Sequence, residues 1–493
     1  MSKVKTPALM FQGTGSDVGK SLLVAGIARA YKRRGLTVRP FKPQNMSNNA
    51  AVTTDGGEIG RAQALQARAA GVDTSVHMNP VLLKPQSNMG SQVVVQGKVF
   101  ATCKARDYYQ LKPKLLPKVM ESFEKLLSQA DLVLIEGAGS PAEVNLRDGD
   151  IANMGFAIMA NVPVILIADV DRGGVLASLV GTFELLTDGE RDLLKGYIIN
   201  KFRGDISLFE PALDIVKDRT NLANFGVVPW FEGAHQLPAE DAVALEKPTI
   251  TSSNQKPIRI IVPRLDRISN FDDFDPLQAE DDVSVEFIKS GNPLPLDGDV
   301  ILLPGSKTTI SDLNAFRENG WDIDIAAHVR QGGMVVGICA GFQMLGQKIS
   351  DPAGIEGPAC TVAGLGLLDI ETRLAGDKSL VGQTGIDLST GAAVQGYEMH
   401  IGTTSGAGLN NPMLGLSGRP DGAISPNGRI MGCYLHGIFA NDDYRAAFLN
   451  RLRKDRQSDI YYEQLVEDTL DQLADHVEAF IDLDKLLEIA KAH

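Results

Sequence analysis

A glycine-rich stretch near the N-terminus constrains the fold of this chain more than any other feature. Residues 13–21 read Gly-Thr-Gly-Ser-Asp-Val-Gly-Lys-Ser. They follow the apolar run 8–11 and precede the helix-like run 21–28. A loop of this kind between a strand and a helix lets backbone N–H groups and the helix N-terminus hold phosphate oxygens. The order of strand, loop and helix therefore predicts an α/β domain with a phosphate-binding loop.

The loop assigns roles to individual residues. Lys20 is expected to reach the β- and γ-phosphates of ATP, and Ser21 is expected to hold Mg²⁺. Gly13 stands six residues before Gly19, one more than the common form G-x-x-x-x-G-K-S requires. The predicted ATP-binding residues are Gly13, Thr14, Gly15, Ser16, Asp17, Gly19, Lys20 and Ser21.

A second magnesium ligand should follow a buried strand beside this loop. Glu136 ends the apolar run 132–135 and is the best candidate for that ligand. Asp150 comes soon after it. Either Asp148 or Asp150 caps a helix that begins near residue 151, or one of them contacts substrate or metal. The predicted substrate-binding residues are Lys42, Gln44, Asn45 and Asp150.

Apolar runs alternate with amphipathic stretches along two long segments of the chain. The strand-like runs are residues 8–11, 131–135, 162–167 and 196–200, and then 258–262, 283–287, 300–303 and 334–338. Continuous apolar strands separated by helices indicate parallel sheets that are covered on both faces. The sequence therefore predicts two doubly wound α/β domains with ligands at the carboxyl ends of their strands.

The 493 residues divide into four predicted segments. The first domain covers residues 1–246 and the second covers residues 258–445. A polar, proline-bounded linker at residues 247–257 separates them. Residues 446–493 are largely helical in pattern, and we expect this tail to pack without chemistry of its own.

Composition excludes several classes of protein. With 44% hydrophobic and 22% charged residues, the chain has the make-up of a soluble globular protein. It has no apolar stretch long enough to cross a bilayer and no secretory pattern, so we expect a cytoplasmic protein. A net charge of −13 argues against a nucleic-acid partner. The four cysteines lack CxxC spacing, which argues against a disulfide framework or a structural metal site.

Cys339 has the setting of a nucleophile. It lies between glycines in the sequence Gly-Ile-Cys-Ala-Gly, directly after the apolar run 334–336. A cysteine on a tight strand-to-helix turn sits at a helix N-terminus, where the dipole favours the thiolate. It also needs a base. His436 follows an apolar strand and is the predicted base, whereas His400 is expected to orient structure or to line the pocket.

Backbone N–H groups near the cysteine complete the predicted site. Gly305 follows another strand of the same predicted sheet, and Ala340 directly follows Cys339. Two N–H groups in such positions stabilise the oxyanion of a tetrahedral intermediate. Gly305 and Ala340 are therefore the predicted oxyanion hole.

The second domain resembles the class I glutamine amidotransferases, through the sequence Gly-Ile-Cys-Ala-Gly-Phe-Gln-Met-Leu-Gly at residues 337–346. Those enzymes typically carry a glutamate two residues after the histidine, where this chain has Ile438. The missing acid is characteristic of the branch that amidates corrin rings, and it leaves the residue that orients His436 unassigned. The extended loop of the first domain resembles that of dethiobiotin synthetase and its relatives.

Three stretches of the first domain, residues 41–50, 80–85 and 136–143, together resemble the cobyric acid synthases. The resemblance implies ATP- and glutamine-dependent amidation of the b, d, e and g carboxylates of (adenosyl)cobyrinic acid a,c-diamide in cobalamin biosynthesis. It implies that Cys339 releases ammonia from glutamine and that ATP activates each carboxylate as an acyl phosphate.

Two alternatives stay open. One is the sister family that makes cobyrinic acid a,c-diamide with the same two chemistries. The other is a P-loop partitioning-type ATPase, which would leave Cys339 and His436 without a role. A glutaminase assay separates the second alternative from the other two readings.

Overall fold

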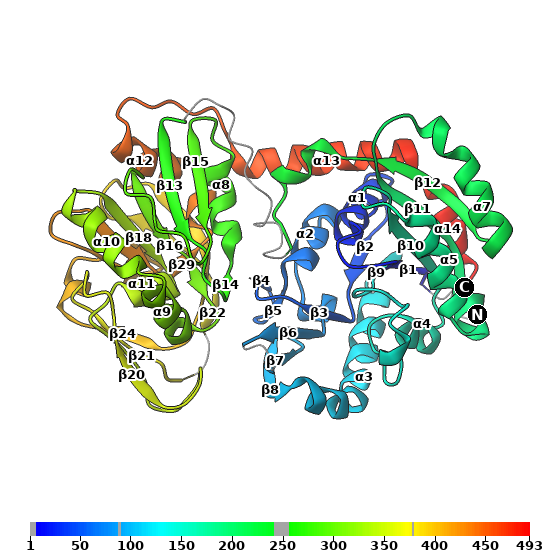
Figure 1. Cartoon of the computed structure of the whole chain (residues 1–493), viewed down its shortest axis with the longest axis horizontal. Coiled ribbons are helices and arrows are strands. Elements are labelled where there is room, and N and C mark those ends of the chain that lie inside the picture. The colour runs from blue at the N-terminus through cyan, green and yellow to red at the C-terminus, as the bar shows by residue number, and fades with distance from the viewer. Residues whose placement is uncertain (1–5, 87–89, 241–255, 377–378) are drawn as a thin grey trace. The chain divides into compact units, whose positions relative to one another are not determined.

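The computed structural model describes residues 6–86, 90–240, 256–376 and 379–493 (Figure 1). The chain forms two compact units. Unit 1 comprises Met1–Ser47, Thr53–Glu240 and Val466–His493, and unit 2 comprises Asn48–Val52 and Asp241–Leu465. The predicted linker, residues 247–257, lies outside the described residues apart from Lys256 and Pro257.

Unit 1 is built on a six-stranded sheet in the order β12-β11-β10-β1-β9-β2, with every pairing parallel. Its strands are β1 (Ala8–Gly13), β2 (Val38–Phe41), β9 (Leu132–Glu136), β10 (Val164–Asp169), β11 (Leu194–Phe202) and β12 (Ala223–Pro229). Strand β1 is buried along its whole length between β10 and β9. Its carboxyl end, where the glycine-rich loop begins, is therefore central in the sheet.

Helices cover both faces of this sheet. They are α1 (Lys20–Arg33), α2 (Arg61–Ala70), α3 (Ala105–Leu127), α4 (Met154–Ala160), α5 (Val175–Leu185), α6 (Asp188–Leu193) and α7 (Glu210–Thr220). Side chains from α3, α4, α5 and α7 share one core with alternate residues of the strands, such as Met10 and Ile135. Helix α1 instead contacts β1, β2 and β9 and takes no part in that core. This parallel sheet and the mainly parallel sheet of unit 2, each flanked by helices, confirm the predicted α/β class.

Unit 1 also contains a smaller sheet in the order β3-β6-β7-β8, which continuous apolar runs did not reveal. Its strands are β3 (Gln44–Met46), β6 (Val81–Pro85), β7 (Gly90–Val95) and β8 (Lys98–Lys104), and β5 (Glu58–Gly60) lies nearby in sequence. The chain returns to unit 1 at its end, through residues 466–480 of α13 (Tyr462–Phe480) and through α14 (Leu483–Lys491). There Arg29 of α1 pairs with Asp471 at 2.8 Å, and Tyr31 Oη donates to the Leu483 carbonyl at 2.7 Å.

Unit 2 is built on a sheet in the order β15-β13-β16-β18-β28-β27, parallel except for the short edge strand β27. The strands are β13 (Ile258–Pro263), β15 (Val283–Ile288), β16 (Val300–Leu303), β18 (Met334–Ile338), β27 (Ala423–Ile424) and β28 (Ile430–Cys433). The helices are α8 (Asp275–Gln278), α9 (Thr309–Glu318), α10 (Trp321–Arg330), α11 (Ala340–Met344) and α12 (Asp442–Leu452). Within the described ranges, no helix of either unit is long and apolar enough to cross a membrane.

Unit 2 also contains two smaller sheets, one antiparallel and one mixed. One group, in the order β26-β25-β22-β23-β29, comprises β22 (Ser379–Asp387), β23 (Ala393–His400), β25 (Leu414–Leu416), β26 (Arg419–Asp421) and β29 (Leu435–His436). A second comprises β19 (Lys348–Asp351), β20 (Cys360–Ala363), β21 (Glu371–Arg373) and β24 (Thr403–Ser405). The remaining strands are β14 (Ile268–Ser269), which pairs with β17 (Gly305–Ser306), and β4 (Ala50–Val52).

Candidate active sites

The glycine-rich loop of unit 1 closes around the side chain of Lys20. The Lys20 ammonium donates hydrogen bonds to the carbonyls of Gly15 and Gly139, each at 3.1 Å. A side chain at Gly13 would begin 2.7 Å from Lys20 Nζ and 2.8 Å from the Gly15 carbonyl, so only glycine fits there. Gly19 has a φ of 90°, a left-handed conformation that favours glycine.

Helix α1 begins at this loop with its first N–H groups facing the loop end. Its N-cap is Gly19, and in the described part of the chain no side chain caps it. Uncapped N–H groups and the helix dipole together attract a phosphate. Burial lowers the pKa of Lys20, and the nearby Glu136 opposes that effect.

An acidic cluster lies beside the loop. Ser21 Oγ lies 2.8 Å from Glu136 Oε1 and 2.6 Å from Glu240 Oε2, and its single proton can be donated to either carboxylate. Lys42 Nζ bridges the same two carboxylates, at 2.7 Å from Glu136 and 2.9 Å from Glu240. The structure therefore brings Ser21 and Glu136 together, as predicted. It adds Glu240, which sequence reasoning missed, and Lys42, which the sequence offered as a substrate residue.

The charges within this cluster compensate one another. Burial lowers the pKa of Lys42, but Glu136 and Glu240 raise it above its ordinary value. Burial raises the pKa of Glu240, but the charge of Lys42 outweighs the effect of burial. The pKa of Glu240 therefore lies below its ordinary value. Lys42 is thus a charged ammonium whose partners are already supplied by the protein.

The oxygen atoms of this cluster fit a hard divalent cation. One hydroxyl and two carboxylates, from Ser21, Glu136 and Glu240, are the donor types that Mg²⁺ prefers, with substrate phosphates and waters completing its shell. No group of three or more His, Cys, Asp or Glu side chains suited to a metal occurs among the residues that the structure describes. A magnesium ion here would therefore depend on the nucleotide for part of its coordination.

The other predicted substrate residues of unit 1 have different surroundings. Gln44 Oε1 accepts a hydrogen bond from Tyr108 Oη at 2.6 Å and is half-buried. Asn45 is buried and donates to Gln63 Oε1 at 3.1 Å. Asn45 therefore contributes to the local fold, and Gln44 keeps a partly accessible amide. The substrate role of both residues stays a prediction.

Asp150 organises the loop before α4. Its carboxylate accepts the backbone N–H groups of Ala152, Asn153 and Gly155, at 2.8, 3.1 and 2.9 Å. This is the capping interaction that the sequence left open as one alternative, although α4 begins at Met154 and not near residue 151. The contacts leave the substrate or metal role of Asp150 a prediction.

In unit 2, Cys339 stands on a strained turn between β18 and α11. Its φ of 54° and ψ of −110° lie in a region that side chains rarely adopt. The flanking glycines make the turn possible, since a side chain at Gly341 would begin 2.2 Å from the Leu303 carbonyl. One at Gly337 would begin 2.6 Å from the Gly341 carbonyl. This geometry is that of a nucleophile elbow.

His436 ends β29 and is oriented by a buried acid. Its Nδ1 lies 2.7 Å from Asp273 Oδ2, and Asp273 Oδ1 accepts the N–H of Gly437 at 2.6 Å. The side chains of Asp273 and His436 are each 1% exposed, so their contact is shielded from water. Asp273 supplies the orientation that the sequence had left unassigned.

The charge on His436 is set by this environment. Burial lowers its pKa, but the charges of Asp273 and Cys339 and hydrogen bonds to both raise it to about 10. With Nδ1 bonded to Asp273, Nε2 is the nitrogen available to the thiol. The three side chains therefore form a relay in the order cysteine, histidine, aspartate.

His400 lies against this relay without joining it. Its ring stacks on Tyr434 with centroids 3.8 Å apart, and its Nδ1 has no hydrogen-bond partner among the described residues. Burial lowers its pKa to about 4, and the charge of His436 contributes to that shift. The adjacent Met399 carbonyl accepts a hydrogen bond from Cys339 Sγ at 3.6 Å. A neutral His400 beside the thiol fits the expected lining role, which stays a prediction.

The predicted oxyanion hole lies on the expected elements. Gly305 pairs with Ser269 between β17 and β14, and a side chain at Gly305 would begin 3.1 Å from His436 Cε1. Ala340 is the first residue of α11, directly after the nucleophile. Their role in stabilising an oxyanion stays a prediction.

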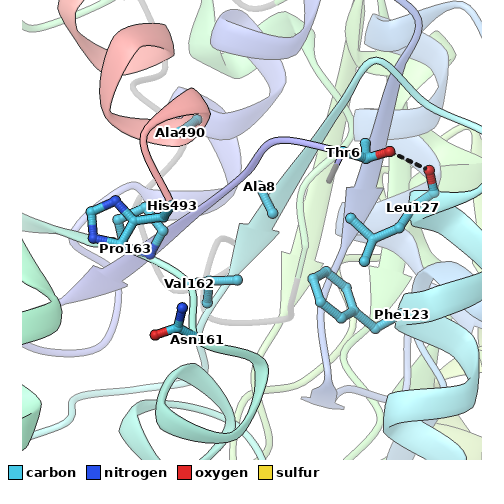
Figure 2. Close-up of a pocket in the computed structure, with 9 residues that line it drawn as sticks. All are labelled: Thr6, Ala8, Phe123, Leu127, Asn161, Val162, Pro163, Ala490 and His493. Carbon is cyan, nitrogen blue, oxygen red and sulfur yellow. Dashed lines mark hydrogen bonds between the residues drawn. The ribbon is translucent and has the colours of Figure 1, made fainter. Parts of the chain in front are cut away.

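A small pocket elsewhere in unit 1 has no such chemistry. Figure 2 shows it between the starts of β1 and β10 and the end of α3, opposite the loop end of the sheet. Thr6 Oγ1 donates to the Leu127 carbonyl at 3.0 Å there, and the remaining lining is mainly apolar. We assign it no role in the reaction.

Two domain models match the chain. Residues 9–244 match the CobQ/CobB/MinD/ParA nucleotide binding domain, and residues 259–444 match the CobB/CobQ-like glutamine amidotransferase domain. These boundaries place the glycine-rich loop in the first domain and the cysteine, histidine and aspartate in the second.

Curated relatives match the chain almost end to end. A cobyric acid synthase of Brucella suis is 56% identical over 98% of this chain and 99% of its own length. One of Methylorubrum populi is 56% identical over 99% of each chain. One of Allorhizobium ampelinum is 54% identical over 98% of this chain and all of its own.

Proposed function

The chain belongs to the cobyric acid synthase family, and we propose that it amidates the b, d, e and g carboxylates of (adenosyl)cobyrinic acid a,c-diamide. It is an enzyme that forms C–N bonds, with a nucleotide-binding domain and a glutamine amidotransferase domain. We propose ATP as the activating nucleotide, Mg²⁺ as its metal and glutamine as the nitrogen source. The buried contact of Asp273 with His436, beside Cys339, is the observation that carries the proposal, because it gives the glutaminase a complete relay.

In the proposed glutaminase half-reaction, the thiolate of Cys339 attacks the carboxamide carbon of glutamine. His436 has taken the thiol proton, and it passes that proton to the departing nitrogen, so the C–N bond breaks and ammonia leaves. Water then attacks the γ-glutamyl thioester with His436 as base, which releases glutamate and restores the thiol. Asp273 holds the imidazole orientation and stabilises the positive charge throughout.

In the proposed ligase half-reaction, a carboxylate oxygen of the corrin attacks the γ-phosphorus of ATP, and ADP leaves. Ammonia then attacks the acyl phosphate carbon, the C–O bond breaks, and inorganic phosphate leaves as the amide forms. Lys20 and the N-terminus of α1 supply positive potential for the phosphates. Ser21, Glu136 and Glu240 would hold Mg²⁺, which neutralises phosphate charge when bound.

The experiment that tests this function is mass spectrometry of the corrin after incubation with the protein, Mg-ATP and glutamine. Successive conversions of four carboxylates into amides support the proposal. Amidation of cobyrinic acid at only two positions, with the a,c-diamide untouched, would instead indicate the sister reaction. We also propose that the enzyme works in the cytoplasm and without a nucleic-acid partner, in keeping with its net charge of −13.

A further inference from the structure

The proposed substrate raises a problem of charge. It carries several peripheral carboxylates, and the protein that must bind it has a net charge of −13. Only one carboxylate reacts at a time, so the others need positive partners near the ATP loop. Lys42 does not meet this need, because Glu136 and Glu240 already hold its ammonium at 2.7 and 2.9 Å. Lys20 is turned into the phosphate loop, where it contacts two carbonyls.

Lys112 of α3 is a largely buried lysine whose ammonium makes no ion pair among the residues that the structure describes. The residue is 9% exposed, and its ammonium makes no hydrogen bond with any described residue. It lies over the ring of Tyr109, 4.5 Å from the centroid. Burial lowers the pKa of Lys112, and the charge of Asp150 partly offsets that effect. The Lys112 ammonium is not among the fully buried polar atoms that lack a hydrogen bond, so it reaches solvent and is accessible to a ligand.

The loop between β9 and α4 runs from the neighbourhood of Lys20 to that of Lys112 within unit 1. Lys112 Cδ lies 3.7 Å from the position that a side chain at Gly149 would take, next to Asp150. The carboxylate of Asp150 is committed to backbone N–H groups, including that of Asn153. Asn153 Nδ2 in turn donates to the Ala138 carbonyl at 2.6 Å, one residue before the Gly139 carbonyl that Lys20 contacts. Lys112 therefore lies beside the loop between β9 and α4, whose Gly139 carbonyl accepts a hydrogen bond from Lys20.

A second donor lies on the same side of α3. Tyr108 stands four residues before Lys112, so the two side chains share one helix face. The Tyr108 hydroxyl donates to Gln44 Oε1 at 2.6 Å, which leaves the Gln44 Nε2 group without a bond to any residue that the structure describes. The Lys112 ammonium and the amide N–H of Gln44, which Tyr108 holds against this face of α3, are suitable donor types for a carboxylate.

We propose that Lys112, assisted by Gln44 Nε2, binds a peripheral carboxylate of the corrin that is not being activated. This inference rests on the proposed function and adds to it a substrate-binding site. Lys112 holds the macrocycle beside the ATP loop while another carboxylate reacts. Its contribution is to substrate affinity and not to the chemical step.

The test compares steady-state kinetics of three variants with those of the wild-type enzyme, with cobyrinic acid a,c-diamide as the varied substrate. Lys112→Met removes the charge at similar size, and Lys112→Arg keeps it. Lys114→Met removes an exposed lysine of the same helix and is the matched control. Losing one charge-assisted hydrogen bond should raise the KM for the corrin by about 10-fold or more in Lys112→Met, with kcat little changed. Lys112→Arg should recover part of this loss, and Lys114→Met should match the wild type.

The KM values for ATP and for glutamine should be the same in all four proteins, which also shows that the variants are folded. Should Lys112→Met fail to fold, Lys112→Gln replaces it under the same criteria. An unchanged KM for the corrin in a folded charge-removing variant overturns the binding site and leaves the proposed function standing. Wild-type enzyme that does not amidate the corrin at all overturns the proposed function instead.

Discussion

Replacing Asp273 by asparagine should disable the glutaminase while leaving the ligase intact. The Asp273 carboxylate lies 2.7 Å from His436 Nδ1, and both groups are 1% exposed. The asparagine would keep the shape of the side chain but lose the charge that stabilises the imidazolium. Breaking a buried charged pair of this kind costs about 3–5 kcal/mol. If that loss is expressed in the transition state, glutamine-dependent turnover falls roughly 10²–10⁴-fold.

The pH dependence follows from the raised pKa of His436. Its folded value of about 10 lies above the ordinary 6.5, so the imidazolium is retained across the neutral range. The stability that this ion pair contributes is fully present below about pH 6.5 and is lost as the pH rises through about 10. In Asp273→Asn the pKa of His436 should fall, so the remaining activity should decline at a lower pH than in the wild type.

The assay measures glutamate release from glutamine between pH 6 and 10, together with corrin amidation supported by ammonium salts. Asp281→Asn is the matched control, because Asp281 is exposed in the same unit. Glutaminase activity in Asp273→Asn within about threefold of the wild type would refute the assigned role of the carboxylate. Loss of the ammonium-supported reaction would show general damage to the fold.

Three other substitutions test the remaining parts. Cys339→Ala should abolish glutamine-supported amidation yet keep amidation with ammonium salts, and loss of both would contradict two separable sites. Glu136→Gln removes a carboxylate that contacts Ser21, so ammonium-supported amidation should fall about 10²-fold or more while glutaminase persists; a change under threefold would exclude Glu136 from the site. Gly341→Ala places a side chain 2.2 Å from the Leu303 carbonyl, so it should lower the free energy of unfolding by about 1–3 kcal/mol. The Tm should fall by several degrees and glutaminase activity should decrease. Gly357→Ala is the control, because open space surrounds Gly357, and its Tm should be unchanged.

Local motifs made much of both sites predictable from the sequence. The strand, loop and helix that surround Lys20 lie within one short stretch, and the same is true of Cys339. In each case the backbone path alone demands glycines at fixed positions, such as Gly13 and Gly341, and so leaves a readable pattern. The apolar runs of the parallel strands were equally direct signals, because such strands are buried on both faces.

Partners that come from distant parts of the chain were not predictable. Asp273 lies 163 residues before His436, in a short 3₁₀ helix (Phe271–Phe274) beside other acidic residues and without a distinguishing pattern. Glu240 lies 219 residues after Ser21 and likewise belongs to a loop without a recognisable motif. Strand β22 and the strands that pair with it were also not predicted from the sequence. Partly exposed antiparallel strands lack a continuous apolar run. Tertiary folding alone decides which of these residues meet.

The most direct test of the coupled function uses glutamine labelled with ¹⁵N in its amide, in the presence of an equal concentration of unlabelled ammonium. The wild-type enzyme is incubated with Mg-ATP and cobyrinic acid a,c-diamide, and the corrin products are analysed by mass spectrometry. Four new amides that carry mainly ¹⁵N are expected, because Cys339 supplies the nitrogen that the ligase consumes. An unchanged corrin, or amides formed without ¹⁵N, would contradict an enzyme that couples the two sites.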